Sequence, residues 1–438
     1  MGKRLIILLA LALLVGSTFS AAYAEVQNVK VSGDITALGV SRKNFDLGYA
    51  TANNNDQNFM ATQVRVRIDA DLTDNVMATV RLINERTWGN TTKDSIGNET
   101  SNNSKIDLDL AYVTLKEFLY SPLTLTVGRQ ELRFGNALII GNGNTLKNGA
   151  GDLNGLPRDL SSRKAFDAIR ATLNYDPLVI DLVYGTVSNV NTNASDDSDL
   201  FGINAGFDIS KKINVQAYVW DKKDKSATGI TDSKKNHVTT VGALVSASLI
   251  EDLKASLEGA FQFGHNRSNS DQDNQHRAFA LQGLLDYTFT KVKYIPMVGI
   301  GATYLSGNSK GHVGWDPMFT DQRIGNIAYA ILPFTNMTIL SAKASVKPMQ
   351  DVTLSASLDH YMLNKSDSSI TNSYNNQSMA INSNKKQLGN EIDLAVTYDY
   401  TEDVQLGLTA GTFLKGSAFS GNKSDNANQI IGSMKVVF

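Results

Sequence analysis

The chain of 438 residues contains no cysteine, only seven prolines and only five histidines. Without cysteine it can form neither a disulfide nor a thiolate metal site, and it has no thiol nucleophile. The formal net charge of −2 at pH 7 excludes the strongly basic footprint that nucleic-acid binding requires. The scarcity of proline beside 34 glycines is typical of a chain rich in β-strands.

The sequence also lacks a long apolar run, because no segment after residue 15 approaches the ~20 residues of a membrane-spanning helix. The longest run, residues 5–15, follows Lys3 and Arg4 and precedes the small-x-small site Ala22-Tyr23-Ala24. This arrangement predicts a secretory signal peptide over residues 1–24, so that the mature protein comprises residues 25–438. A membrane crossing within 25–438 would have to be a closed β-barrel.

Segments of about ten residues with alternating polarity recur along the chain. In residues 60–72 (MATQVRVRIDADL) the apolar side chains share one face and the charged side chains share the other. Residues 105–114, 253–263 and 391–400 repeat the pattern. A row of charges needs water and the opposite apolar row needs an apolar solvent. The repetition therefore predicts transmembrane β-strands rather than the edge of a soluble sheet.

Short and long connections alternate between these segments. Short polar turns occur near residues 73–75, 120–122, 176–177, 210–212, 250–252, 290–293, 347–351 and 401–403. Long polar loops occupy about 41–59, 87–104, 134–163, 188–198, 221–236, 264–276, 306–335, 364–387 and 415–428. The pattern predicts an all-β fold, a transmembrane antiparallel β-barrel of about eighteen strands with short periplasmic turns and long extracellular loops.

The last segment, residues 429–438 (QIIGSMKVVF), alternates in polarity and stops on an aromatic residue. A final strand ending on phenylalanine is typical of barrels in the outer membrane of Gram-negative bacteria, although a soluble sheet protein could end in this way. We therefore expect Phe438 to act as an assembly signal for the barrel assembly machinery. We also expect the last strand to pair with the strand that begins near Val29. The membrane partners would be outer-membrane lipid and lipopolysaccharide.

The inward rows of such a barrel would carry many charges. The residues predicted to line the pore from these rows are Arg65, Arg67, Asp69, Arg81, Asp107, Asp109 and Arg170. Arg81 could face either Asp107 or Asp109 on the next strand. Paired charges of this kind can hold the shape of a wet wall, and they can also set which solutes pass.

The longest early loop, residues 134–163, carries an apolar patch at 137–140 inside glycine-rich sequence. An exposed patch would be a liability, so we expect the loop to fold inward and constrict the pore rather than pack on the outer rim. The residues predicted to form this constriction are Leu138, Ile139, Ile140, Lys147, Arg158 and Arg163. Residues 312–335 are a second apolar-rich candidate for a plug.

Several short motifs occur in a characteristic order: 127–135 (VGRQELRFG), 165–175 (AFDAIRATLNY), 316–319 (DPMF) and 388–393 (LGNEID). This ordered set resembles the alginate-export family of outer-membrane barrels. The resemblance implies an eighteen-stranded barrel and passage of an acidic polysaccharide over lumenal arginines, with Arg129 of the GRQEL motif among them. By strict alternation Arg129 shares a face with Val127, so it reaches the lumen only if Gly128 forms a bulge.

We therefore predict an outer-membrane channel for passive diffusion of charged or polar solutes, with export of an acidic polysaccharide such as alginate as the specific option. The nearly even mix of acids and bases in the predicted lumen does not suit a pore dedicated to a polyanion. A general porin and a structural or adhesive barrel are the alternatives. We expect no enzyme activity and no cofactor or metal. Adjacent strand residues such as Asp359 and His360 point to opposite faces.

Overall fold

The computed structural model describes most of the chain after the predicted signal peptide. The described residues are 28–49, 56–89, 92–93, 99–100, 106–143, 156–187, 198–224, 236–267, 273–309, 312–420 and 425–438. The predicted signal peptide and Lys147 lie outside these ranges. None of the helices within them has the length and apolar character needed to cross a membrane.

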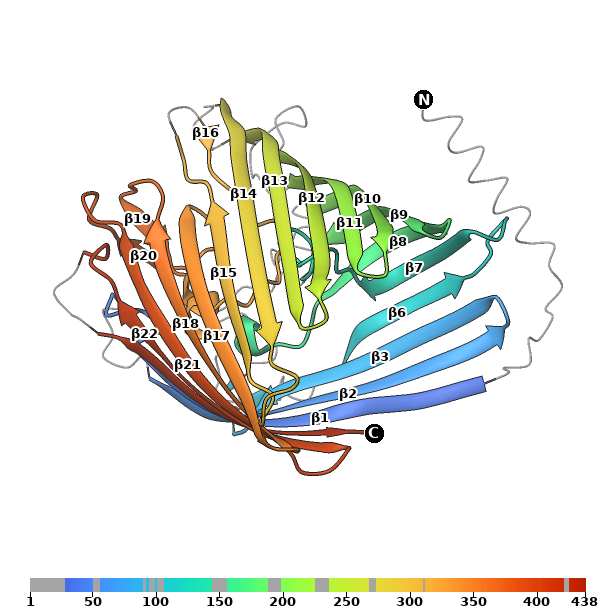
Figure 1. Cartoon of the computed structure of the whole chain (residues 1–438), viewed down its shortest axis with the longest axis horizontal. Coiled ribbons are helices and arrows are strands. Elements are labelled where there is room, and N and C mark those ends of the chain that lie inside the picture. Colours follow the sequence, from blue (N-terminus) through green and yellow to red (C-terminus); the bar gives the residue numbers. More distant parts are fainter. Residues whose placement is uncertain are drawn as a thin grey trace.

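One large sheet of nineteen strands forms the molecule, and eighteen of these strands follow one another in an antiparallel ring (Figure 1). The remaining strand, β16 (His312–Val313), is a two-residue strand that pairs parallel with β14. The ring consists of β1 (Asn28–Lys43), β2 (Gln57–Thr73), β3 (Val76–Thr87), β6 (Asp107–Leu115), β7 (Leu123–Glu131), β8 (Ala165–Asn174), β9 (Leu178–Val187), β10 (Ser198–Ser210), β11 (Ile213–Asp224), β12 (Asn236–Ile250), β13 (Leu253–Arg267), β14 (Asp273–Thr288), β15 (Met297–Leu305), β17 (Met337–Met349), β18 (Val352–Leu363), β21 (Gln387–Asp399), β22 (Val404–Lys415) and β23 (Ala427–Val437).

The first and last strands close the ring. β1 pairs with β2 on one side and with β23 on the other, in a register that runs from Asp34 opposite Val437 to Lys43 opposite Asn428. Figure 1 shows the C-terminus beside β1. Closure leaves no unpaired strand edge, as a spanning sheet requires. The predicted strand number and the predicted pairing of the last strand with the first are both confirmed.

The connections alternate as the sequence predicts. Eight neighbouring strand pairs are joined by the predicted short turns, for example from Thr73 of β2 to Val76 of β3. The other nine connections are the predicted long loops, and several contain further elements. These are β4 (Thr92–Lys93), β5 (Glu99–Thr100), the 3-10 helix η2 (Arg158–Leu160), α2 (Ile327–Ile331), β19 (Ser369–Thr371) and β20 (Ser378–Ala380).

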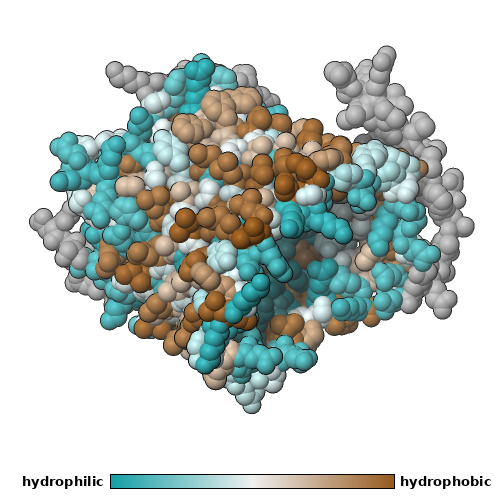
Figure 2. Space-filling view, in the orientation of Figure 1, coloured by the Kyte–Doolittle hydropathy of each residue, from teal (hydrophilic) through white to brown (hydrophobic). Residues whose placement is uncertain are grey.

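The polarity of the wall is the reverse of that of a soluble protein. On β13, Leu257 is 56% exposed while its neighbour Glu258 is 1% exposed. Alternation along a strand therefore sends apolar side chains outward and polar side chains inward. Figure 2 shows apolar side chains over the outward face of the wall, beside a hollow edged by polar side chains.

The apolar core lies inside the barrel, where the long loops meet. Its members include Leu138, Ile139 and Ile140 from the loop after β7, and Phe319 and Ile327 from the loop after β15. Inward-facing wall residues such as Val183 and Leu200 complete it. The loop after β7 therefore lies inside the barrel, and so does the loop after β15.

Candidate functional site: the lumen and its two inward loops

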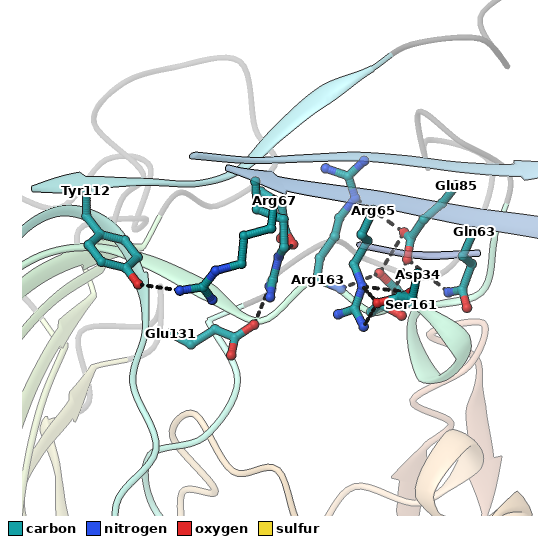
Figure 3. Close-up of polar contacts among 12 residues, drawn as sticks. Asp34, Gln63, Arg65, Arg67, Glu85, Tyr112, Glu131, Ser161 and Arg163 are labelled. Carbon is teal, nitrogen blue, oxygen red and sulfur yellow. Dashed lines mark hydrogen bonds and ion pairs between the residues drawn. The ribbon is translucent and has the colours of Figure 1, made fainter. Parts of the chain in front are cut away.

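Two arginines of β2, Arg65 and Arg67, lie among polar side chains of neighbouring strands on the lumenal side (Figure 3). On β2, Arg65 forms an ion pair with Asp34 of β1 at 2.6 Å, and Arg67 pairs with Asp69 at 2.7 Å. The Arg67 guanidinium also donates a hydrogen bond to the Tyr112 hydroxyl at 3.4 Å. The predicted inward row of β2 is therefore present, and each arginine of this row has a carboxylate beside it.

A β-bulge decides which acid meets Arg81 of β3. The β3–β6 register shifts between Arg81 and Leu82, so that Asp109 is the extra residue on β6. Arg81 pairs with Asp109 at 2.5 Å and also contacts Glu131 of β7. The alternative partner, Asp107, instead lies 2.5 Å from Arg163. Of the two predicted partners of Arg81, the structure selects Asp109.

Arg170 of β8 lies on the lumenal side as well. Its guanidinium pairs with Asp181 of β9 at 2.7 Å, and Thr172 donates to the same carboxylate at 2.6 Å. The guanidinium carbon also lies 5.2 Å from the centre of the Phe134 ring. This cation–π contact joins the wall to the start of the first inward loop.

Arg129 does not reach the lumen. Gly128 has a φ of +125°, but the registers of β7 with β6 and with β8 both run through it without a shift. Arg129 therefore lies on the same outward face of β7 as Val127, whose side chain is 42% exposed. Its guanidinium pairs with Asp167 of β8 at 3.0 Å. The expectation that Arg129 lines the pore is wrong, because the backbone at Gly128 changes conformation without inserting a residue.

The first inward loop leaves the wall after β7 and crosses the lumen. Ala137, Leu138, Ile139 and Ile140 are all at most 3% exposed. The side chain of Asn136 donates to Ser256 of β13 at 3.3 Å and to Gln282 of β14 at 3.4 Å. The loop thus reaches strands well round the ring from its own origin at β7. The patch that would be a liability in water is buried against the second loop.

The returning half of this loop is held by buried ion pairs. Arg163 lies 3.3 Å from Glu85 of β3, and both side chains are under 10% exposed. Asp159 in η2 pairs with Arg42 of β1, which is fully buried. Arg158, in contrast, is exposed. Of the predicted constriction residues, Arg163 anchors the loop, while the apolar residues form the body of the constriction.

The second inward loop, between β15 and β17, joins the first through the backbone. Phe319 forms a parallel bridge with Ile140, and its N–H donates to the Ile139 carbonyl at 3.0 Å. The N–H groups of Gly141 and Asn142 donate to the Phe319 carbonyl at 2.8 and 2.9 Å. The loops therefore act as one body, and the Phe319 ring packs edge-on against Phe166 of β8.

The DPMF motif explains how the second loop is fixed to the wall. Asp316 accepts a hydrogen bond from Lys222 of β11 at 2.7 Å, while its backbone N–H donates to Gln262 of β13 at 2.8 Å. Burial raises the pKa of Asp316 most strongly, but the Lys222 charge and the hydrogen bonds from Lys222 and from the Met318 N–H together lower it by more, so the pKa lies below its ordinary value of 3.8. The Asp316 side chain also accepts from the N–H of Met318.

The far end of the second loop is held by β21. The N–H groups of Ile327 and Ala328 at the start of α2 donate to the two oxygens of Glu391, at 2.6 and 2.7 Å. Asp393 accepts from the N–H of Asn326 at 3.3 Å. The LGNEID motif, which contains both acids, therefore positions the plug. This role could not be predicted from the sequence, because the pattern of a strand does not show which distant backbone N–H groups a lumenal carboxylate will bind.

Two adjoining recesses lie below the loops, toward the short-turn end of the barrel. One of about 290 Å³ is bounded by Arg133, Arg323 and the lower halves of β14, β15, β17 and β18. The other, of about 390 Å³, lies over the ends of β10 to β14. Both share Asn136, Leu284 and Asp286. The charged residues that line them are Arg133, Asp208, Lys211, Lys212, Lys254, Asp286, Asp321, Arg323, Lys343 and Asp359.

One buried carboxylate organises the rim of these recesses. Asp321, 4% exposed, lies 2.9 Å from Arg133 and also contacts Lys164. The Arg133 side chain remains 56% exposed, and its neighbour on the loop, Arg323, is exposed too. Arg133 and Arg323 are not among the predicted pore-lining residues, because their places on inward loops cannot be inferred from strand alternation.

The side chains of Asp359 and His360 on β18 have separate surroundings. Asp359 faces inward and is 3% exposed, whereas His360 hydrogen-bonds Asn390 at 2.6 Å. Across the described part of the chain, no group of three or more histidine or acidic side chains is placed to hold a metal ion. The polar groups of the lumen pair mainly with one another.

Comparison with known proteins places this geometry in a family. A family model described as Alginate export matches residues 28–433. No match was found among curated protein sequences. Solved structures with the same fold come from Pseudomonas aeruginosa. OccK8 (OprE) is 12% identical, with a TM-score of 0.59, over 94% of this chain and 99% of that chain.

Two further Pseudomonas aeruginosa structures agree. OccK3 (OpdO) is 11% identical, with a TM-score of 0.57, over 95% of this chain and 97% of that chain. OpdK, solved with vanillate, is 11% identical, with a TM-score of 0.54, over 93% and 99%. At this identity the likeness concerns the fold. The family model matches nearly the whole barrel, and the chain therefore belongs to the alginate export family of outer-membrane channels.

Proposed function

We propose that this barrel passes small acidic solutes by passive diffusion and catalyses no reaction. The observation that carries the proposal is the pair of inward loops, which are hydrogen-bonded to each other and border recesses of about 290 and 390 Å³ among the described residues. Recesses of this size suit a sugar acid or another small carboxylate rather than an open path for a polymer.

The charges around the recesses favour an anion. Six cationic and four acidic side chains line the two recesses together. Arg133 and Lys343 are more than half exposed, so they can meet a solute directly. The arginines of β2, β3 and β8 carry less weight, because their side chains are only 11–36% exposed. Arg133 and Lys343 are also paired, with Asp321 and Asp286, but they project further into water and therefore attract anions more strongly.

Export of an acidic polysaccharide is the second candidate, and membership of the alginate export family favours it. For this function the two loops would have to move aside together, since they are bonded to each other. The geometry of the constricted lumen supports the small-solute function better, and the following experiment separates it from polymer export.

The test is the reversal potential of the purified channel in a planar bilayer under a salt gradient, with a monomeric uronate or a polyuronate added. We expect anion preference, a current reduced by the monomer and little response to the polymer. Block by the polymer at concentrations where the monomer has no effect would favour polysaccharide export. Absence of any ion current would overturn conduction and return the adhesive or enzymatic barrel to consideration.

A further inference from the structure

One carboxylate of the second inward loop lies between the two ends of the first. Arg133 follows β7 and Lys164 directly precedes β8, so these two cations mark the ends of the first inward loop. Both contact the same oxygen of Asp321, Oδ2. The backbone of Asp321 is held against the first loop as well, because its N–H donates to the Ala137 carbonyl at 3.0 Å. The Asp321 carboxylate is therefore placed between these cations by backbone contacts.

The Asp321 carboxylate is satisfied on one side only. Its side chain is 4% exposed, and its other oxygen, Oδ1, is buried and accepts no hydrogen bond from the described residues. Arg133 donates from Nη1 alone, at 2.9 Å. Arginine binds a carboxylate most strongly through two parallel hydrogen bonds, one to each oxygen. The contact between Arg133 and Asp321 is therefore weaker than the contact that Arg133 could make with a free carboxylate.

The two cations differ in their access to the lumen. Arg133 is 56% exposed and lines the recess of about 290 Å³, whereas Lys164 is 25% exposed and does not line it. A carboxylate that enters the recess can therefore reach the Arg133 guanidinium directly. Lys164 stays beside Asp321 when Arg133 turns to the solute, so the buried Asp321 carboxylate keeps a cation. Loss of both cations would leave a buried charge unpaired, which is costly.

We propose that Asp321 is an internal competitor of the solute, and that Arg133 exchanges between the Asp321 carboxylate and the carboxylate of the solute. The inference rests on the proposed passage of small acidic solutes and names Arg133 as the residue that binds them. The solute takes the guanidinium in the bidentate geometry that Asp321 does not use. Competition keeps the affinity low, and a conducting site must bind a solute weakly enough to release it.

The competition is tested with Asp321→Asn, which keeps the shape of the side chain and removes its charge. Binding of galacturonate, and of uncharged galactose, to the full-length mature barrel in detergent is measured by ligand-observed NMR. If Asp321 holds Arg133 for at least roughly nine-tenths of the time, the variant should bind galacturonate at least about tenfold more tightly. Binding of galactose should not change.

Asp359→Asn is the matched control for the loss of one negative charge. Asp359 is 3% exposed and lines the same recess, but it forms no ion pair with a cation among the described residues. This variant should tighten galacturonate binding much less than Asp321→Asn does. Equal tightening by the two variants would overturn the proposal, because the recess would then respond only to its total charge.

Variants of the two cations separate exchange from simple attraction. Lys164→Gln should weaken galacturonate binding to the otherwise unaltered protein, because Asp321 then depends on Arg133 alone. The same change should have little effect in the Asp321→Asn background, and equal weakening in both backgrounds would overturn the exchange. Arg133→Gln should abolish the tightening that Asp321→Asn produces. Retention of that tightening would show that Arg133 is not the residue that binds the solute.

Failure of this inference is distinguishable from failure of the proposed function. The reversal potential shows whether anions pass, whereas the titrations show what competes with an anion inside the channel. An anion-selective channel whose Asp321→Asn variant binds galacturonate no more tightly would overturn the competition and leave the proposed passage in place. Tightening in a channel without anion preference would support the competition and overturn the proposed passage.

Discussion

At the scale of single residues, pairing decides what a charge can do in this lumen. Arg65, Arg67, Arg81 and Arg170 each lie between 2.5 and 2.7 Å from a carboxylate. Pairs that remain partly wet stabilise the wall by only about 0–1 kcal/mol each. Their larger effect is to neutralise one another at short range. Arg133 on the first inward loop also pairs with a carboxylate, that of Asp321, but it is 56% exposed and is therefore a group that a passing anion would meet.

Arg133 and Arg129 form a matched pair of sites for testing this view. Arg133→Glu should shift the reversal potential toward cations, because the side chain edges the recess. Arg129→Glu should leave it unchanged, because that side chain faces outward beside Asp167. The two variants make the same charge change four residues apart in sequence. Equal shifts in single-channel recordings would contradict the placement of Arg129.

Gly128 is a second site where one residue matters. Its φ of +125° is rarely adopted by other residues, and an added Cβ would lie 2.2 Å from the Ala111 carbonyl oxygen. Gly128→Ala should therefore lower the free energy of unfolding by about 1–3 kcal/mol. Urea titrations of the refolded barrel measure this. The control is Gly432→Ala, because a Cβ added at Gly432 has no atom within 4 Å. This variant should have the same urea midpoint as the unaltered protein. Equal midpoints for Gly128→Ala and Gly432→Ala would refute the strain at Gly128.

At the scale of elements, the inward loops behave as one body with anchors on several strands. Lys222 holds the second loop through Asp316, Glu391 holds α2, and Glu85 holds the first loop through Arg163. The backbone bridge between Ile140 and Phe319 joins the two loops. Loss of one anchor should loosen both loops rather than one.

Asp316→Asn tests the coupling of the loops and its pH dependence. The folded pKa of Asp316 is lowered, so its contribution is complete above about pH 3.8 and is lost as the pH falls toward the folded value. In the unaltered protein, current noise from loop motion should rise only below about pH 4. The variant should show that noise at neutral pH, with a loss of about 1–3 kcal/mol, between the values for exposed and buried pairs.

Conductance traces recorded from pH 3 to 8 would separate the outcomes. A variant as quiet as the unaltered channel at pH 7 would mean that Asp316 does not hold the loop. Asp224→Asn is a suitable control, because Asp224 lies 3.5 Å from the same lysine but belongs to β11 and not to the loop.

At the scale of the whole molecule, closure by β1 and β23 makes the barrel. Phe438 takes part directly: it accepts from the N–H of Gly33 at 2.8 Å and donates to the Gly33 carbonyl at 3.0 Å. Its ring lies over Gly33, where an added Cβ would come within 2.7 Å of it. The last residue therefore extends the closing ladder by one more pair.

Deletion of Phe438 should reduce the amount of assembled protein in the outer membrane far more than the conductance of each assembled channel. The reason is that the residue pairs at the seam and has no contact with the inward loops. Heat-modifiable migration of membrane fractions and single-channel recording measure the two quantities. Wild-type surface levels of the truncated chain would contradict the predicted role as an assembly signal.

Local patterns in the amino-acid sequence are enough to predict the barrel, its strand number and its closure. Period-two alternation and the regular succession of short turns and long loops are local properties. They can be recognised in the sequence without knowledge of any contact between distant residues. The inward rows of β2, β3 and β8 follow from the same local rule. The apolar patch at 137–140 also predicts an inward loop, because an apolar patch in a long loop would otherwise be exposed to water.

The side of the wall on which Arg129 lies, the partner of Arg81 and the anchors of the loops depend on contacts between distant parts of the chain. A bulge at Asp109 and its absence at Gly128 depend on how neighbouring strands align. Asp316 and its partner Lys222 are 94 positions apart in the sequence. Glu391 is 64 and 63 positions from the two residues of α2 that it contacts. Such pairings carry no local periodicity. The wall of this barrel could therefore be inferred from alternation, whereas the passage through it depends on where the long loops meet inside.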